Sequence, residues 1–195
     1  LSAFFCNVGG KLVNIKDSVC NGCYAMKGFY GMMKKQHTKN HFRKMNKFNN
    51  TKLWILSFSD YLNNHYKTTS KIDGNYFRWF DSGDIQSYRM LLAIVEICRN
   101  TPQIKHWIPT KEYSLIRRYL KEYDDFPSNM CVRVSSPMMD VVMRGFKNTS
   151  SVIKTGKPVA ARNHKICMAA EQNNECKECR LCWNTSIKNI TYKYH

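Results

Sequence analysis

Four cysteines near the end of the chain have the spacing of a metal-binding loop. They are Cys167, Cys176, Cys179 and Cys182, and the last three form two consecutive C-x2-C steps. Such a run places three thiolates on one tight loop, and four cysteines complete the ligand set of a [4Fe–4S] cluster or of tetrahedral zinc. Zinc sites usually separate two C-x2-C pairs by a longer spacer. The spacing therefore favours a [4Fe–4S] cluster, with zinc as the alternative.

Three further cysteines lie near the start of the chain, at Cys6, Cys20 and Cys23. Three thiolates make an incomplete site, which either keeps an open coordination position or is completed from elsewhere. A single site that takes any four of these seven cysteines from both ends is an alternative. A third interpretation treats Cys6 as a small core residue, so that only the C-x2-C pair binds metal.

The two remaining cysteines are predicted to be core residues. Cys98 lies on an apolar helix face and Cys131 lies within a strand, and free cysteine is among the most buried residue types. The total of nine is odd, which excludes a fully paired disulfide set within one chain. No secretory leader opens the sequence, so we expect a reducing compartment.

The middle of the chain alternates between strand-like and helical segments. Strands are predicted at residues 76–80, 105–108 and 129–134, and helices at residues 86–99 and 114–123. This alternation predicts an α/β fold with a partial parallel (β/α) sheet or barrel-like core and right-handed crossovers. Ligands of such sheets bind at the carboxyl ends of the strands. The residues at those ends are Asp81, Ser82, Gly83, Asp84, Thr110, Lys111, Glu112, Ser135 and Ser136.

Asp81 and Asp84 allow two interpretations. Two carboxylates at a strand end could hold a hard cation, with Lys111 and Glu112 nearby, and serve a hydrolytic enzyme acting on nucleic acid. The sequence Asp-Ser-Gly-Asp is also an ordinary turn, and Asp84 is a good N-cap for the helix that follows. We favour the turn and cap.

One domain of 195 residues is expected, in three parts. Residues 1–30 are predicted to form an irregular cysteine-rich loop. Residues 38–146 form the α/β core, which begins with two helices that break near Asn49 and Asn50. Residues 147–195 are predicted to be a mostly irregular, cluster-binding tail.

The chain is strongly basic, with a formal net charge of +17. No acidic residue occurs between Asp17 and Asp60 or from Val141 to Ala170, and both stretches are rich in lysine and arginine. Such fields attract polyanions, above all nucleic acid, although a solvated basic surface is the simpler alternative. Apolar runs are too short to span a bilayer, so no membrane partner is expected.

Several motifs together resemble the gene-product-eighty-eight family of phage and plasmid proteins. The resemblance covers nearly the whole chain, and it implies a viral protein in the cytoplasm of a bacterial host cell, with no particular reaction. One departure is Met168, where the family pattern leads us to expect proline after Cys167. The motifs are Cys6-Asn-Val-Gly-Gly-Lys-Leu, Ser18-Val-Cys-Asn-Gly-Cys-Tyr-Ala-Met-Lys-Gly, Tyr76-Phe-Arg-Trp-Phe-Asp-Ser-Gly-Asp, Trp107-Ile-Pro-Thr-Lys-Glu-Tyr, Val132-Arg-Val-Ser and Cys182-Trp.

The chain is also loosely similar to radical S-adenosylmethionine enzymes, which combine a partial parallel barrel with a three-cysteine site near the N-terminus. That similarity implies that the N-terminal cysteines hold a cluster whose open iron binds the cofactor. The usual C-x3-C-x2-C spacing is stretched here to C-x13-C-x2-C, and no Gly-Gly-Glu-type segment follows the second strand. The residues that would line the cofactor pocket are Asp84, Thr110, Lys111 and Ser135.

The sequence thus predicts a phage-type [4Fe–4S] protein whose cluster is structural or redox-active. The first alternative is a radical S-adenosylmethionine enzyme. The second is a zinc-stabilised module that binds nucleic acid through its basic stretches.

Overall fold

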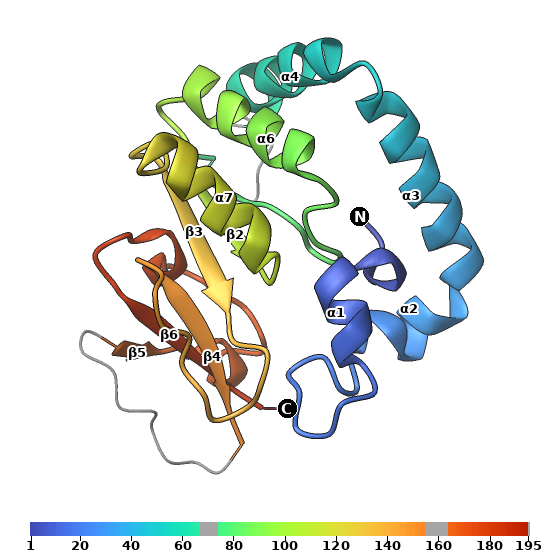
Figure 1. The fold of residues 1–195 in the computed structure, drawn as a ribbon, viewed down its shortest axis with the longest axis vertical. Helices are drawn as coiled ribbons and strands as arrows, with labels where there is room; N and C mark the ends of the chain where they lie inside the picture. Colours follow the sequence, from blue (N-terminus) through green and yellow to red (C-terminus); the bar gives the residue numbers. More distant parts are fainter. Residues whose placement is uncertain (67–73, 155–163, 195) are drawn as a thin grey trace.

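A six-stranded parallel sheet forms the centre of the computed structural model, which describes residues 1–66, 74–154 and 164–194 (Figure 1). Every strand pair is parallel, and the strand order is β1-β2-β3-β4-β6-β5. The predicted α/β class with a parallel sheet is therefore confirmed. The strands are β1 (Tyr76–Arg78), β2 (Lys105–Thr110), β3 (Met130–Ser135), β4 (Thr149–Ile153), β5 (His164–Ile166) and β6 (Asn189–Lys193).

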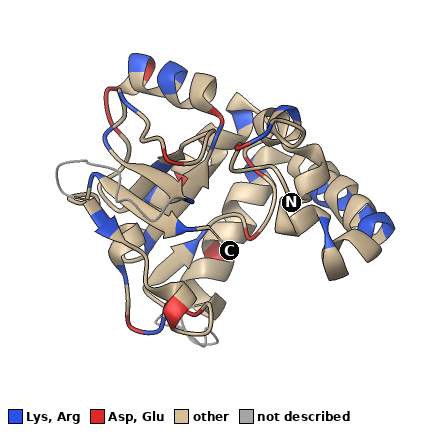
Figure 2. Cartoon of the chain, turned by 90° about the horizontal axis from the view of Figure 1, so that it is seen from below, with Lys and Arg blue, Asp and Glu red and all other residues tan. Residues whose placement is uncertain are grey.

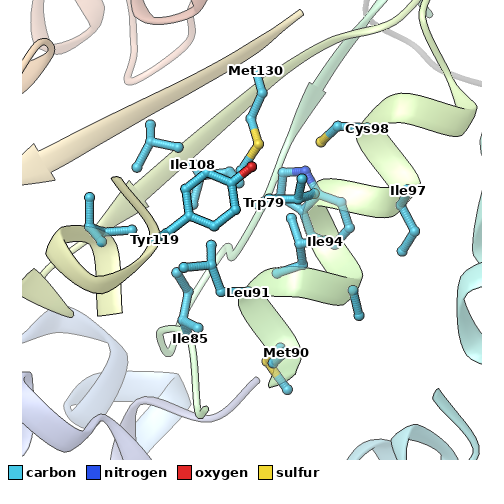
Figure 3. Packing of buried hydrophobic residues seen from close by; sticks show 14 of the residues in the cluster. Trp79, Ile85, Met90, Leu91, Ile94, Ile97, Cys98, Ile108, Tyr119 and Met130 are labelled. Atoms are coloured by element: carbon cyan, nitrogen blue, oxygen red, sulfur yellow. The ribbon is translucent and has the colours of Figure 1, made fainter. Parts of the chain in front are cut away.

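Two amphipathic helices cover one face of β2 and β3, namely α6 (Tyr88–Asn100) and α7 (Tyr113–Tyr123). Their apolar side chains pack on Ile108 and Met130 in the main core (Figure 3). Ser87, and not Asp84 as predicted, caps α6, because its Oγ accepts a hydrogen bond from the amide of Met90 at 3.2 Å.

Alternate residues of β2 and β3 face opposite sides of the sheet, as the period of two in a strand requires. Ile108, Val132 and Val134 belong to the core beneath α6 and α7. On the other face, Trp107 and Arg133 meet the C-terminal segment around the short helix η5 (Leu181–Trp183). A cysteine-bearing segment therefore takes the place of a helix on that face.

Two helices precede the sheet and are separated at Asn49 and Asn50, as predicted. They are α3 (Lys34–Phe48) and α4 (Thr51–Asp60), and a π-helical turn, η3 (Tyr61–Tyr66), extends α4. The side chain of Asn50 caps α4 by accepting from the amide of Leu53 at 3.1 Å. Whereas α4 packs on α6, α3 runs along the rim of the molecule towards the N-terminal segment (Figure 1).

The expectation of an irregular loop over residues 1–30 is wrong in part. The segment contains α1 (Asn7–Leu12), α2 (Gly28–Met32) and two short 3-10 helices, η1 (Ala3–Phe5) and η2 (Tyr24–Met26). Only residues 13–23 form turns and bends, apart from a one-residue bridge at Ser18. The short α1 includes two consecutive glycines, which weaken the helical pattern in the sequence.

The expectation of a mostly irregular tail after Lys147 is also wrong in part, because the described residues there include three strands and the 3-10 helices η4 (Ala169–Glu171) and η5. The strands β4 and β6 have few apolar residues, and their polar side chains pair with each other. Ser151 Oγ lies 2.9 Å from Thr191 Oγ1, and Asn189 donates to both hydroxyls at 3.0 Å. These strands therefore lack the apolar pattern that identifies a strand in a sequence.

No helix among the described residues is long and apolar enough to cross a membrane. Residues 155–163, which belong to the second basic stretch, lie outside the described part of the chain.

Candidate metal centres

The three N-terminal cysteines gather at the start of α1. Cys6 directly precedes the helix, and the chain then returns so that Cys20 faces the same point. A Cβ atom at Gly9 would lie 3.5 Å from Cys20 Sγ and 3.7 Å from Cys6 Sγ, so the glycine leaves room for both sulfur atoms. Cys23 lies one turn later and contributes to the electrostatic field at both thiols.

The N-terminal thiols are buried beside one cation and one carboxylate. Burial raises the pKa of Cys6 to about 12, and the nearby Asp84 raises it further. Burial also raises the pKa of Cys20, but the ammonium group of Lys111 next to it opposes that shift. Lys111 is thus the described cation placed to stabilise a thiolate at this position.

Asp84 is a structural residue of the strand ends. Its carboxylate accepts hydrogen bonds from Thr110 Oγ1 at 2.6 Å and from the amides of Lys111 and Ile85 at 2.8 Å. Burial raises its pKa, while these hydrogen bonds oppose the shift. The structure therefore brings together three of the four residues predicted for a cofactor pocket, but Asp84 and Thr110 are engaged with each other. Asp81 lies apart from this network and accepts from the hydroxyl of Tyr30 at 2.9 Å.

The four C-terminal cysteines lie on β5, η5 and the turns that join them. Cys167 follows β5, and its amide donates to the carbonyl of Thr191 on β6 at 2.8 Å. Its sulfur accepts from the amide of Ala169, as the sulfur of a bound thiolate commonly does. Cys182 lies in η5, with Sγ 3.3 Å from the hydroxyl of Tyr192. Burial raises the pKa of Cys182 to about 12, and its neighbours Cys167 and Cys176 raise it further.

Arg133 fastens this segment to the sheet. It is fully buried in the middle of β3 and donates five hydrogen bonds, all to backbone carbonyl oxygens. Among the described residues no carboxylate forms an ion pair with it. The acceptors are Cys182 at 2.8 Å, Asn184 at 2.7 Å, Ile187 at 3.0 Å, Leu181 at 3.1 Å and Thr149 at 3.4 Å.

A cavity of about 380 Å³ lies at the carboxyl edge of the sheet, between the two cysteine sets. Cys167, Cys176 and Cys182 line one side, and Lys111, which neighbours Cys20, lines another. Ser135 also lines it and accepts from the hydroxyl of Ser150 at 3.1 Å. Of the predicted pocket residues, Lys111 and Ser135 thus face the cavity.

The donor set of each group fits a thiolate-bound metal in composition. In the part of the chain that the structure describes, no three or more His, Cys, Asp or Glu side chains are arranged so that they could hold a metal ion. Metal binding therefore requires rotation of thiol side chains within each set. Cys98 and Cys131 are 0% and 1% exposed, as predicted for core thiols.

Several residues of this region are not predicted to be site residues from the sequence. Arg78 and Trp107 line the cavity, and the guanidinium of Arg78 lies 4.9 Å from the Trp107 ring centroid. The strand patterns around Arg78 and Trp107 predict only that strand residues are buried. The sequence does contain a signal for Arg133, because this charged residue interrupts the otherwise apolar strand Met-Cys-Val-Arg-Val. Lysine and arginine are almost never fully buried without a partner.

Comparison with known proteins agrees with the motif resemblance. The sequence profile of the family described as Gene product 88 matches residues 3–185. No curated protein and no solved structure matches the chain. The profile spans both cysteine sets and all of the strands except β6, and so the chain belongs to the Gene product 88 family.

Proposed function

We propose that this protein binds a [4Fe–4S] cluster through Cys167, Cys176, Cys179 and Cys182. The observation that carries the proposal is the burial of Arg133 beside these thiols with no carboxylate partner among the described residues. Removing a cation from water costs several kcal/mol, which hydrogen bonds and a nearby negative charge offset. Five carbonyl oxygens solvate the guanidinium group, and within the described part of the chain no anion neutralises its charge.

A metal–thiolate group supplies the missing negative charge. Burial raises the pKa of Cys182 to about 12, so its thiol is neutral at pH 7 unless a metal displaces the proton. Four thiolates around a cluster leave a net anion, which suits the environment of Arg133. Tetrahedral zinc in the same four thiolates is the alternative, since it is also anionic.

The N-terminal cysteines form the second metal site of the proposal. Cys6, Cys20 and Cys23 provide three thiolates, and the fourth coordination position remains for another ligand. When bound, the C-terminal cluster ties the end of the chain to β3 and adds its binding energy to folding. It can also carry electrons, which makes its role structural or redox-active.

Anaerobic purification followed by iron, sulfide and zinc analysis tests the proposal. We expect broad absorption near 400 nm, roughly four irons and four sulfides for the C-terminal site, and their loss when its cysteines are replaced by serine. Replacement of the core thiol Cys98 by alanine is the matched control and should leave the iron content unchanged. A colourless protein with zinc would exclude the cluster, and a protein without either metal would exclude the whole proposal.

A second candidate function is S-adenosylmethionine-dependent radical chemistry in the N-terminal half of the site. It is favoured by the position of a three-thiol set next to a cavity at the carboxyl edge of a parallel sheet. The pocket residues would be Asp84, Thr110, Lys111 and Ser135, of which the first two hold the shape of the strand ends. Reductive cleavage of S-adenosylmethionine, abolished by Cys20→Ser, would support it. Binding of iron without cleavage would exclude it.

The helix α3 supports nucleic acid as the partner. Its exposed face carries Lys35, Lys39, Arg43 and Lys47 at intervals of four, and no acid occurs in the helix (Figure 2). Like charges at this spacing repel one another and destabilise the helix. A polyanion that neutralises them removes this repulsion. Phe42, 53% exposed between them, adds a surface on which a base can stack. We propose that this contact occurs in the cytoplasm of a bacterial host cell.

Binding of a fluorescent DNA duplex at several salt concentrations tests the role of α3. Replacing the four basic residues by glutamine should weaken binding. It should also reduce the slope of the logarithm of the affinity against the logarithm of the salt concentration by an amount that corresponds to about four phosphate contacts. The matched control replaces four exposed cations of other elements, namely Lys16, Lys121, Arg144 and Lys188, and should have a smaller effect. Equal effects of the two variants would show that net charge alone attracts the DNA.

A further inference from the structure

We infer that the cavity between the two cysteine sets is a binding site for a small organic anion that carries a phosphate or a carboxylate. The inference goes beyond metal binding: Cys167, Cys176 and Cys182 line one side of the cavity, and the anion is assigned to the cations of the other walls. Its volume of about 380 Å³ lies within the roughly 300–1,000 Å³ of typical small-molecule sites.

The charge of the walls selects the ligand. Three cations line the cavity, Arg78, Lys111 and Lys193, and none of the described lining residues is acidic. Lys193 pairs with Glu171 on the neighbouring surface. No carboxylate among the described residues forms an ion pair with Arg78 or Lys111. Arg78 donates a hydrogen bond to Tyr24 and Lys111 donates one to Cys20, and each cation has further donors for an anion.

The other polar groups of the walls are also donors. The indole N–H of Trp107 is buried and has no hydrogen-bond partner among the described residues. A buried donor without an acceptor is costly and rare in native proteins. The hydroxyl of Ser135 accepts from Ser150, which leaves its own proton to donate.

The place of the cavity in the fold agrees with this chemistry. It lies over the carboxyl ends of β2, β3 and β4, where parallel sheets bind ligands. The aromatic side chain of Tyr24, which is 61% exposed, offers flat apolar surface beside the donors. A planar group with one anionic substituent, about the size of a nucleoside monophosphate, matches both features.

Calorimetric titration of the anaerobically purified full chain tests the inference with two pairs of probes. Adenosine monophosphate against adenosine isolates the phosphate, and S-adenosylhomocysteine against methylthioadenosine isolates the carboxylate-bearing part. We expect the anionic member of at least one pair to bind at least tenfold more tightly, and whichever pair shows the difference identifies the source of the anion.

Variants locate the binding site. Arg78→Met and Lys111→Met should each weaken binding of the anion about tenfold, whereas Lys121→Met on the exposed surface of α7 should leave it unchanged. Equal binding within both pairs of probes, or equal losses in all three variants, would overturn the inference. Metal analysis of the same samples separates the two claims, because anion binding without metal would refute only the proposed cluster.

Discussion

The two cysteine sets differ in how firmly the fold holds them. The C-terminal set lies on a segment that Arg133 joins to β3 through four hydrogen bonds, and two strands of the sheet flank it. The N-terminal set lies on short helices and turns. One side-chain hydrogen bond, from the amide of Val8 to Glu112 at 3.2 Å, joins α1 to the start of α7.

This difference assigns different roles to the two sets. Four thiols on a segment fixed to the sheet match a closed, structural metal site, in which metal affinity becomes folding stability. Three thiols on short helices and turns, next to a cavity and a cation, match a site where a further ligand enters. Each prediction below tests that division.

The largest effect should come from the loss of one ligand in each set. Cys182→Ser should remove the C-terminal metal and lower the melting temperature by more than about 10 °C, because structural metals contribute many kcal/mol to folding. Cys23→Ser should remove metal only from the N-terminal site and lower the melting temperature by less than about 3 °C. Calorimetric melting with metal analysis measures both, and equal shifts would contradict the division.

Replacement of Arg133 should have the next largest effect. Arg133→Met removes one donor from each of five carbonyl oxygens and removes the cation beside the thiols, so we expect a loss of at least about 3 kcal/mol in unfolding free energy. The C-terminal metal should be lost while the N-terminal metal stays. Arg144→Met, an exposed change on the loop before β4, is the control for urea denaturation. A variant that keeps its C-terminal metal would show that Arg133 serves packing alone.

The pH dependence of metal affinity should distinguish four thiols from three. Burial raises the pKa of Cys6 and of Cys182 to about 12, so these thiols are protonated at neutral pH and release protons when metal binds. Affinity therefore falls as the pH falls. Between pH 6 and 8 the logarithm of the affinity should change by about four per pH unit at the C-terminal set and about three at the N-terminal set.

Cobalt titrations of two variants, each with one set replaced by serine, measure these slopes through the thiolate absorption band. The two slopes should differ by about one proton, equivalent to tenfold per pH unit. Identical slopes would mean that a fourth thiol, or another acid, completes the N-terminal site.

The sequence predicts the central sheet better than the ends of the chain. The helix predicted at residues 114–123 spans Tyr113–Tyr123, and the strand predicted at residues 129–134 spans Met130–Ser135, because apolar residues follow the periodicity of each element. The strand β4 is invisible to this pattern, since Ser150 and Ser151 are buried through hydrogen bonds with other polar side chains. The gathering of each cysteine set follows from spacing, whereas the Arg133 anchor depends on tertiary contacts.

The smallest effect should come from the side-chain hydrogen bond that joins α1 to the start of α7. Glu112→Ala removes the acceptor of the Val8 amide and should cost about 1 kcal/mol in unfolding free energy, whereas Glu112→Gln keeps an acceptor oxygen and should cost less. Both variants should retain the C-terminal metal, since Glu112 lies on the N-terminal side of the cavity. Loss of N-terminal metal in Glu112→Ala alone would show that this contact positions Cys6. A loss as large as that of Arg133→Met would mean that the fold holds both sets equally firmly, and the division into a structural site and an open site would fail.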